Sequence, residues 1–292
     1  MNGKGFRLAA TRRLLASFRR LSSHGETVCF LHIPKTGGTS IHEAVTNGVL
    51  GIRVCPIRTS TNQGDLSQLS GHDLVSGHFD MHVAMYLKKR RFTLVTQLRR
   101  PIERLASLYN FLRAHSLAKH PKCREDPAFH ELVRLIKEQP PREFFKSDVC
   151  MEYSSLSYGM NNHIARLLML EPSLPDGPHA SRHLRDHLRA CINEFDHVGF
   201  IDDQLSTINF IRKRLSLPTV THARKMKETA NEMLWHEWME PVQLATPGEL
   251  EPYTRHLIWA DNIAFELARD MFSKSSARPH LSSRVQKRDP NP

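Results

Sequence analysis

The sequence predicts an α/β fold, a P-loop-like three-layer sandwich with a mostly parallel central sheet. Short, almost wholly apolar segments alternate along the chain with segments whose apolar residues recur at helical spacing. Such alternation is typical of a parallel sheet with helices on its faces. One apolar segment, Thr27–Ile33, runs into a Gly-Gly turn followed by a helical pattern. A second, Phe92–Leu98, runs directly into a helix opened by Pro101, a residue that suits the first helical position.

The elements follow from these two periodicities. Apolar runs without alternation are typical of strands that are buried on both faces. We expect strands over Thr27–Ile33, Leu74–His78, Phe92–Leu98 and His197–Phe200. Ile102, Leu105 and Leu108 recur at helical spacing after Pro101 and give that helix one buried face. The other helices are expected from about Thr39, over Met81–Arg90, near His130–Lys137, Asn161–Leu170 and His183–Ile192, and over Asp203–Leu215 and Tyr253–Phe272.

Charge is concentrated at the two ends of the chain. Of the net charge of +11, residues 1–24 hold +6 and residues 273–292 hold +4, so the residues between them are nearly neutral. A nearly neutral body does not indicate binding to nucleic acid or to another anionic polymer. Within the body, positive charge gathers between Lys88 and Arg104, where seven basic residues accompany one acid.

The chain divides into a leader, one domain and a tail. Residues 1–24 form a basic leader, either disordered or an amphipathic helix, and such a helix suits peripheral contact with an anionic membrane or an organelle transit peptide. Residues 25–272 hold the α/β pattern, and residues 273–292 are expected to be a disordered tail. No run approaches 18 apolar residues, and the five cysteines are scattered without a C-x-x-C pair. These features favour a cytoplasmic protein with reduced thiols, at the membrane surface if the leader docks there.

The segment Cys29–Ser40 is the most informative stretch of the sequence. It reads C-F-L-H-I-P-K-T-G-G-T-S and places a lysine and a Gly-Gly turn between a buried strand and a helix start. Backbone N–H groups in such a turn bind anions together with the helix N-terminus. We therefore expect anion contacts from Lys35, Thr36, Gly37, Gly38, Thr39 and Ser40. In a purely structural alternative, Ser40 and Glu43 form a capping box that only starts the helix.

Residues 32–40, H-I-P-K-T-G-G-T-S, resemble the 5′-phosphosulfate loop of the carbohydrate sulfotransferases. That family contains the heparan and chondroitin sulfate enzymes and their bacterial relatives. The resemblance implies that the donor is 3′-phosphoadenosine 5′-phosphosulfate (PAPS), and that Lys35 contacts its bridging oxygen and stabilises the leaving nucleotide. The nucleoside-triphosphate loop differs, because its lysine follows the glycines.

A second motif follows the strand Phe92–Leu98. It reads R-R-P-I-E-R-L-A-S-L-Y over Arg99–Tyr109 and resembles the family pattern R-D-P-x-x-R-x-x-S-x-Y. The resemblance implies that Arg99 and Ser107 hold the 3′-phosphate of the donor. Arg99 lies at the carboxyl end of a strand, where open α/β sheets bind ligands. The family's Asp is here Arg100, which opposes the helix macrodipole at a cost of about 0.3–1 kcal/mol unless a bound anion offsets it.

The acceptor side is expected around His78. The stretch S-G-H-F over Ser76–Phe79 resembles the family's G-H-[VF] segment, whose histidine acts as general base on the acceptor hydroxyl. Histidine suits this role because its pKa lies near the working pH. Glu103 and Glu43 are alternative bases. The histidines of this region lack the helical pairing with a carboxylate that a hydrolytic zinc site needs, so no metal site is predicted.

The resemblance covers residues 26–272 in outline and implies a PAPS-dependent sulfotransferase with Lys35 and His78 as its catalytic residues. The expected partner is a hydroxylated carbohydrate or glycolipid, with neither a metal nor nucleic acid involved. Two alternatives remain. One is a nucleotide-dependent kinase on the same architecture, although no evident magnesium carboxylate follows the loop. The other is a non-catalytic adaptor that keeps the fold for membrane or protein binding.

Overall fold

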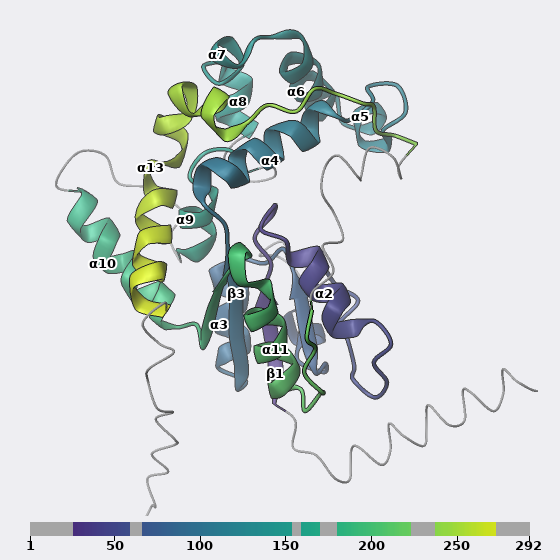
Figure 1. Ribbon diagram of the computed structural model, residues 1–292, viewed down its shortest axis with the longest axis vertical. Coiled ribbons are helices and arrows are strands. Elements are labelled where there is room, and N and C mark those ends of the chain that lie inside the picture. The colour runs from purple at the N-terminus through teal and green to yellow at the C-terminus, as the bar shows by residue number, and fades with distance from the viewer. Residues whose placement is uncertain (1–25, 59–65, 154–158, 170–179, 223–236, 273–292) are drawn as a thin grey trace, which may run out of the picture.

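A computed structural model of the chain describes residues 26–58, 66–153, 159–169, 180–222 and 237–272. Its centre is a sheet of four parallel strands in the order β2-β1-β3-β4, with helices on both faces (Figure 1). The predicted α/β class with a parallel sheet is confirmed. None of the helices in the described ranges has the length and apolar composition that crossing a bilayer requires. The predicted leader and tail lie outside these ranges.

The four strands are the predicted apolar runs. They are β1 (Thr27–Leu31), β2 (Leu74–Gly77), β3 (Phe92–Leu98) and β4 (His197–Phe200). Every residue of β3 is buried, as expected of an inner strand with helices on both faces. Leu31 pairs with Gly77 on one side and with Thr96 on the other. The carboxyl ends of β1 and β2 therefore lie side by side at one edge of the sheet, with β3 extending slightly beyond them.

Side chains alternate along the strands between two apolar cores. Val28 and Phe30 of β1 pack on one face with the helices α2 (Gly38–Thr46) and α11 (Gln204–Arg214). Cys29 and Leu31 face the opposite core. That core is covered by α3 (Met81–Lys88), α9 (His163–Leu168), α10 (Ala180–Asn193) and the C-terminal part of α13 (Pro247–Phe272).

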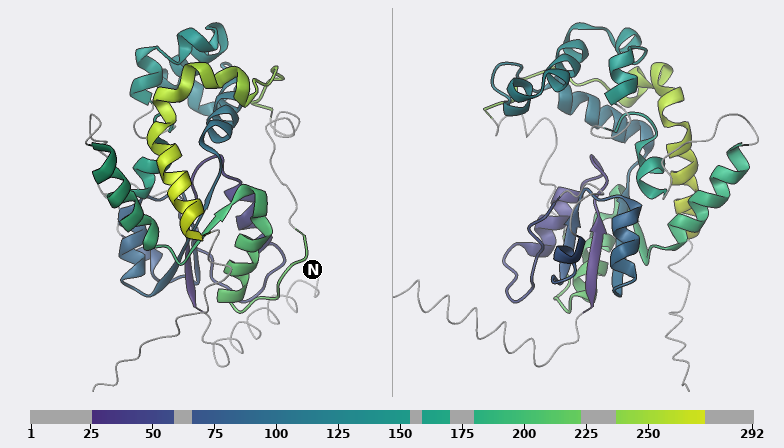
Figure 2. Two further views of the ribbon diagram at one scale, coloured as in Figure 1. Left: turned by 60° about the vertical axis from the view of Figure 1, so that its left-hand side comes forward. Right: turned by 180° about the vertical axis from the view of Figure 1, so that it is seen from behind.

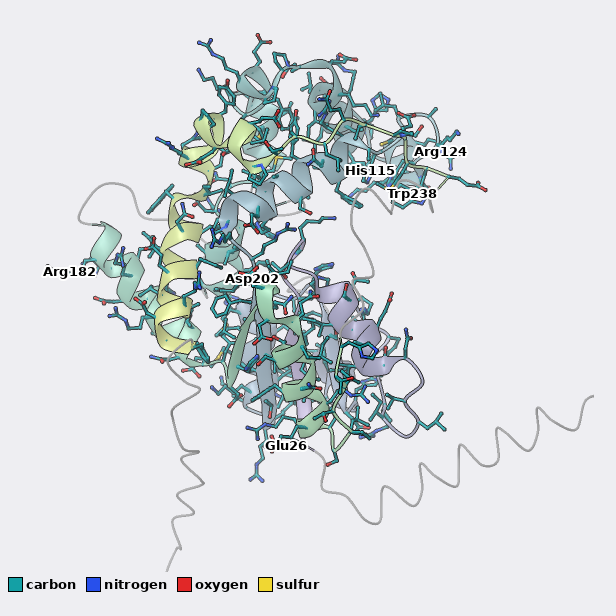
Figure 3. The ribbon with its side chains drawn as sticks, viewed as in Figure 1. Glu26, His115, Arg124, Arg182, Asp202 and Trp238 are labelled. Carbon is teal, nitrogen blue, oxygen red and sulfur yellow. The ribbon has the colours of Figure 1, made fainter. Side chains whose placement is uncertain are left out.

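A second group of helices, here called the helical cap, stands over the carboxyl ends of the strands (Figure 2). It consists of α4 (Pro101–Arg113), α5 (Pro121–Glu125), α6 (Pro127–Glu138), α7 (Pro141–Phe144), α8 (Asp148–Tyr153) and the start of α13. Its own apolar core includes Tyr109, Phe129 and Phe144. Because only Arg99 and Arg100 separate β3 from α4, the cap is fixed directly above the sheet edge. In Figure 3, Glu26 and Asp202 mark the lower and upper ends of the sheet.

The sequence prediction omits α5, α7 and α8, the 3-10 turns at Leu66–Leu69 and Ile201–Asp203, and the first turn and a half of α13. The signal for the earlier start of α13 was present. Thr246 and Glu249 form a capping box, in which the carboxylate lies 2.6 Å from the Thr246 N–H and the hydroxyl lies 3.3 Å from the Glu249 N–H. Pro252 lies inside this helix and removes one backbone hydrogen bond. Packing of α13 against α4, α9 and α10 outweighs that loss.

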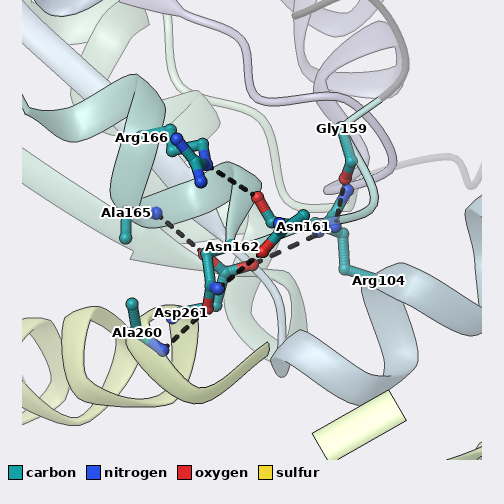
Figure 4. A network of polar contacts seen from close by, with 8 residues as sticks. All are labelled: Arg104, Gly159, Asn161, Asn162, Ala165, Arg166, Ala260 and Asp261. Carbon is teal, nitrogen blue, oxygen red and sulfur yellow. Dashed lines mark hydrogen bonds and ion pairs between the residues drawn. The ribbon is translucent and has the colours of Figure 1, made fainter. Parts of the chain in front are cut away.

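A polar network joins α4, α9 and α13 where the cap meets the sheet layer (Figure 4). Asn162 enters the backbone ladder of α13: its Oδ1 accepts from the Ala260 N–H at 2.7 Å, and its own N–H donates to the Leu257 carbonyl at 2.5 Å. Beside it, Asp261 of α13 lies 4.0 Å from Arg104 of α4, and both side chains are fully buried. These contacts fix the cap relative to the sheet.

Candidate active site

Residues 32–40, here called the anion loop, lie at the carboxyl end of β1 and lead into α2. Lys35 and Gly37 have left-handed backbone conformations, with φ of 68° and 83°. Gln97 of β3 donates to the Thr36 carbonyl at 2.5 Å, and Gln204 of α11 donates to the Gly37 carbonyl at 3.3 Å. The glutamines bind carbonyl oxygens of the loop, whereas an anion would bind its N–H groups. These hydrogen bonds therefore leave the N–H groups of the loop available to an anion. Neither glutamine was predicted, because nothing local in the sequence marks such long-range contacts.

The Gly-Gly pair is required by neighbouring side chains. A Cβ on Gly38 would meet the His32 ring at 2.0 Å, and a Cβ on Gly37 would meet the Gln204 amide nitrogen at 2.1 Å. Both distances are far inside van der Waals contact. The sequence interpretation assigned the glycines to the close approach of an oxyanion. The structure adds a steric reason that lies within the chain itself.

The start of α2 has no side-chain cap. A glycine in a left-handed conformation stands at its N-cap position. The alternative in which Ser40 and Glu43 form a capping box that starts the helix is therefore wrong. Ser40 is buried inside the first turn, next to a half-buried Thr39, and the Thr36 hydroxyl donates within the loop, to the Ile33 carbonyl at 2.8 Å. A helix N-terminus without a capping side chain presents backbone N–H groups and the positive end of the dipole.

The side chain of Lys35 extends from the anion loop to the helical cap. Its Nζ lies 4.0 Å from the centre of the Phe111 ring in α4, a distance at which an ammonium group and a ring attract each other. Phe111 also contacts the rings of His115 and Trp238, with centroids 4.6 and 6.5 Å away. Figure 3 shows His115 and Trp238 together in the cap. Lys35 therefore bridges the loop and the cap.

Ser107 lies on the side of α4 that also carries Phe111, because Glu103, Ser107 and Phe111 follow one another at four-residue spacing. At the start of this stripe, the Nε atoms of Arg99 and Arg100 lie 3.4 and 4.0 Å from the Glu103 carboxylate. Glu103 thus offsets the positive charge at the N-terminus of α4, where the sequence interpretation invoked a bound anion. Glu103 was also an alternative base, but its carboxylate is already paired with Arg99 and Arg100.

His78 follows β2 and is joined to the anion loop. Its Nδ1 lies 2.8 Å from the backbone carbonyl of His32, and the two rings are 4.4 Å apart. Because a carbonyl only accepts, Nδ1 carries the proton and Nε2 keeps a lone pair when the ring is neutral. Burial lowers the pKa of His78 below its usual value, and this outweighs the hydrogen bond to His32, which raises it. His78 therefore presents an unprotonated Nε2 at neutral pH.

Sequence reasoning missed two residues that contact His78. His32 is buried, and its pKa lies well below 6.5 because of burial and of the bases around it, which are His78, Arg58, His42 and Lys35. Arg58 is half-buried, and its Nη1 lies 2.7 and 2.8 Å from the two ring nitrogens of His42. His32 had a signal, since it stands in the loop motif. Arg58 had none, because neither periodicity nor spacing marks it.

Glu43, the other alternative base, lies on α2. Its Oε2 is buried without a hydrogen-bond partner among the described residues. Where the structure describes the chain, no three His, Cys, Asp or Glu side chains are grouped closely enough to hold a metal ion. The site thus consists of a helix N-terminus, a loop lysine and a neutral histidine, an arrangement suited to binding an anion beside a proton acceptor.

A scan against protein-family models gives no match, and a search of the curated proteins gives none either. The resemblance of the two motifs to the carbohydrate sulfotransferases therefore stays a prediction. The site has to be interpreted from its own geometry and chemistry.

Proposed function

We propose that the chain is a sulfotransferase that moves a sulfuryl group from PAPS onto a hydroxyl of a carbohydrate or glycolipid. The observation that carries the proposal is the bond from His78 Nδ1 to the His32 carbonyl, 2.8 Å long. It joins an unprotonated base to the same turn that holds Lys35. The contact of Lys35 with Phe111 supports the proposal further, because it brings the first motif against the helix that carries the second.

In the proposed reaction, the acceptor oxygen attacks the sulfur of PAPS in line with the bridging oxygen. A bond forms between the acceptor oxygen and sulfur, the bond from sulfur to the bridging oxygen breaks, and its electron pair stays on the phosphate. His78 takes the acceptor proton at Nε2. Lys35 and the N–H groups at the start of α2 stabilise the charge that develops on the departing phosphate oxygen.

Arg99 and Ser107 hold the donor through its 3′-phosphate in this proposal. A phosphate there replaces Glu103 as the partner of Arg99, a change that charge-assisted hydrogen bonds to arginine favour. Positioning and electrostatics carry such a transfer, by analogy with phosphoryl transfer. No metal takes part.

The proposal also covers the fold, the cellular location and the partners of the enzyme. Residues 25–272 form a P-loop-like three-layer sandwich, which the helices on both faces of the sheet support. The enzyme acts in the cytoplasm, and residues 1–24 provide peripheral contact with a membrane surface that carries the acceptor. Nucleic acid is not a partner, since the body of the chain is nearly neutral.

The test is binding of 3′-phosphoadenosine 5′-phosphate (PAP), the product nucleotide, to the full chain. We expect PAP to raise the melting temperature and 5′-AMP to do so much less. Arg99→Ala should weaken PAP binding by about 10- to 150-fold, because a charge-assisted contact contributes about 1.5–3 kcal/mol. Arg182→Ala, which changes an exposed arginine on α10 (Figure 3), is the control with the same charge change.

Two outcomes would overturn the proposal. Stabilisation by ATP with magnesium but not by PAP would favour the kinase. Indifference to every nucleotide would favour the adaptor.

A further inference from the structure

The backbone of Arg58 crosses the end of β2 and fixes the position of His78. The His78 N–H donates to the Arg58 carbonyl at 2.7 Å. This approach depends on the glycine before His78, because a Cβ on Gly77 would meet the same carbonyl oxygen at 2.1 Å. His78 is thus held on both sides by main-chain carbonyls, by that of Arg58 through its backbone and by that of His32 through its ring.

The guanidinium group of Arg58 faces a neutral partner. Its Nη1 lies within 2.8 Å of the His42 ring nitrogens, and since a guanidinium only donates, the nitrogen that it meets accepts. Burial and the charge of Arg58 lower the pKa of His42 to about 4, so its ring does not compete for protons near neutral pH. Arg53, in the same segment, has an acidic partner instead, because its guanidinium lies 2.8 Å from the Asp73 carboxylate.

The groups with which His78 interacts electrostatically are basic. Three groups interact with it directly: His32 from the anion loop, Arg58 from the segment before β2 and His163 from α9. Lys35 and His42 act on His32, and Arg104 of α4 acts on His163. His32 and His163 are buried, and the pKa of each lies well below its usual value because of burial. A permanent positive charge from Arg58 therefore acts on a ring whose histidine neighbours are neutral.

We propose that Arg58 is a positioning residue for the base: its carbonyl holds the backbone of His78, and its guanidinium, held against His42, adds a permanent positive charge to the surroundings of the His78 ring. A role of Arg58 in catalysis rests on the proposed sulfuryl transfer. The electrostatic effect of Arg58 on His78 does not, so the two ideas can fail separately. Arg58 itself contacts neither donor nor acceptor in this proposal.

The test is an NMR titration of the full-length protein with labelled histidine, in which the His78 signal is assigned by its loss in His78→Gln. We expect the His78 midpoint of the wild type to lie below 6.5. Arg58→Gln, which removes the charge and keeps the carbonyl, should move that midpoint to higher pH. Arg53→Gln removes a charge that Asp73 already neutralises and should leave the midpoint unchanged. Arg58→Lys should titrate as the wild type does.

An unchanged or lowered midpoint in Arg58→Gln would overturn the inference, as would an equal rise in Arg53→Gln. Should Arg58→Gln fail to fold, Arg58→Met keeps the apolar stem and serves as the second neutral variant. In PAPS turnover, the acidic limb of the pH profile should move with the His78 midpoint. If the midpoint moves but PAP does not bind, the inference about Arg58 stands and the proposed function fails.

Discussion

At the scale of the residue, the anion loop and the base are one unit. The carbonyl that fixes the His78 tautomer belongs to His32, and the His32 ring fills the space that a side chain on Gly38 would need. A displacement of the loop therefore displaces the ring of His78. Binding of a donor at the loop and orientation of the base are coupled through this single buried histidine.

We predict that His78→Ala reduces turnover by about 10²–10⁴, the usual contribution of a general base, and leaves the affinity for PAP unchanged. The base meets the acceptor and not the phosphates. Transfer from labelled PAPS to a panel of glycans measures turnover, and calorimetry measures PAP binding. His82→Ala, at an exposed position on α3, is the control. Near-normal turnover in His78→Ala would transfer the role of base to Glu43.

We predict that Gly38→Ala lowers the free energy of unfolding by about 1–3 kcal/mol, as overpacking does, because its Cβ would meet the His32 ring at 2.0 Å. Gly71→Ala is the matched control, since nothing lies within 4 Å of its Cβ position, and its effect should stay within about 0.5 kcal/mol. Urea unfolding of both variants measures the difference. Equal stabilities would contradict the contact between Gly38 and His32.

At the scale of the element, α13 depends on a residue outside itself. Asn162 precedes α9 with φ of 49°, a left-handed conformation that asparagine tolerates better than most residues. Its side chain accepts from the Ala260 N–H inside α13. Insertion of a side chain into a helical ladder is a recognised cause of bending. The two parts of α13 pack in different cores, Leu257 in that of the cap and Ala264 in that beside the sheet.

We predict that Asn162→Ala destabilises the fold by about 2–4 kcal/mol, because it leaves a buried N–H unpaired and strains a left-handed position. Asn162→Gly should cost less, since glycine relieves the strain but not the lost hydrogen bond. Asn193→Ala, at an exposed position, is the control. Urea midpoints at a constant m-value provide the measurement. If the Gly and Ala variants are equally stable, strain at this position plays no part.

At the scale of the whole molecule, histidines are built into the interior in their neutral form. Burial lowers the pKa of His115 and of His197 to about 4. Between about pH 4 and 6.5 the unfolded chain therefore binds protons that the folded chain does not. Asp261 acts in the opposite sense, because burial raises its pKa to about 6, so between pH 3.8 and 6 only the folded chain holds that proton. Two histidines act against this one aspartate, so on balance the unfolded chain binds more protons in this range.

We predict that the free energy of unfolding is highest above pH 6.5 and falls as the pH drops toward 4. Each buried histidine contributes a slope of up to about 1.4 kcal/mol per pH unit. His197→Phe keeps a ring stacked on Phe210, as His197 is, but removes one titrating group, so its slope should be shallower by up to that amount. Denaturant titrations from pH 5 to 8 measure both slopes. Equal stability at pH 5 and 7 would contradict the prediction.

The sequence by itself determined what depends on neighbours along the chain. The apolar runs at Phe92–Leu98 and His197–Phe200 became strands with the predicted bounds, and Pro101 opened its helix as expected. A strand buried on both faces and a proline-led helix are encoded locally, in composition and period. The Lys-Thr-Gly-Gly turn was located for the same reason, because a buried strand and a helix flank it in sequence.

Only the tertiary structure decided which groups meet. It paired Glu103 with Arg99, set Lys35 against Phe111, and bonded His78 to the carbonyls of His32 and Arg58. It also gave the glycines of the loop their steric role and excluded Ser40 as the start of α2. Most of these contacts join residues far apart in the chain, so their distances follow from how the sheet and the cap pack, which no local pattern encodes. The chemistry of the site is therefore written in the sequence as residue types, and its geometry comes from the fold.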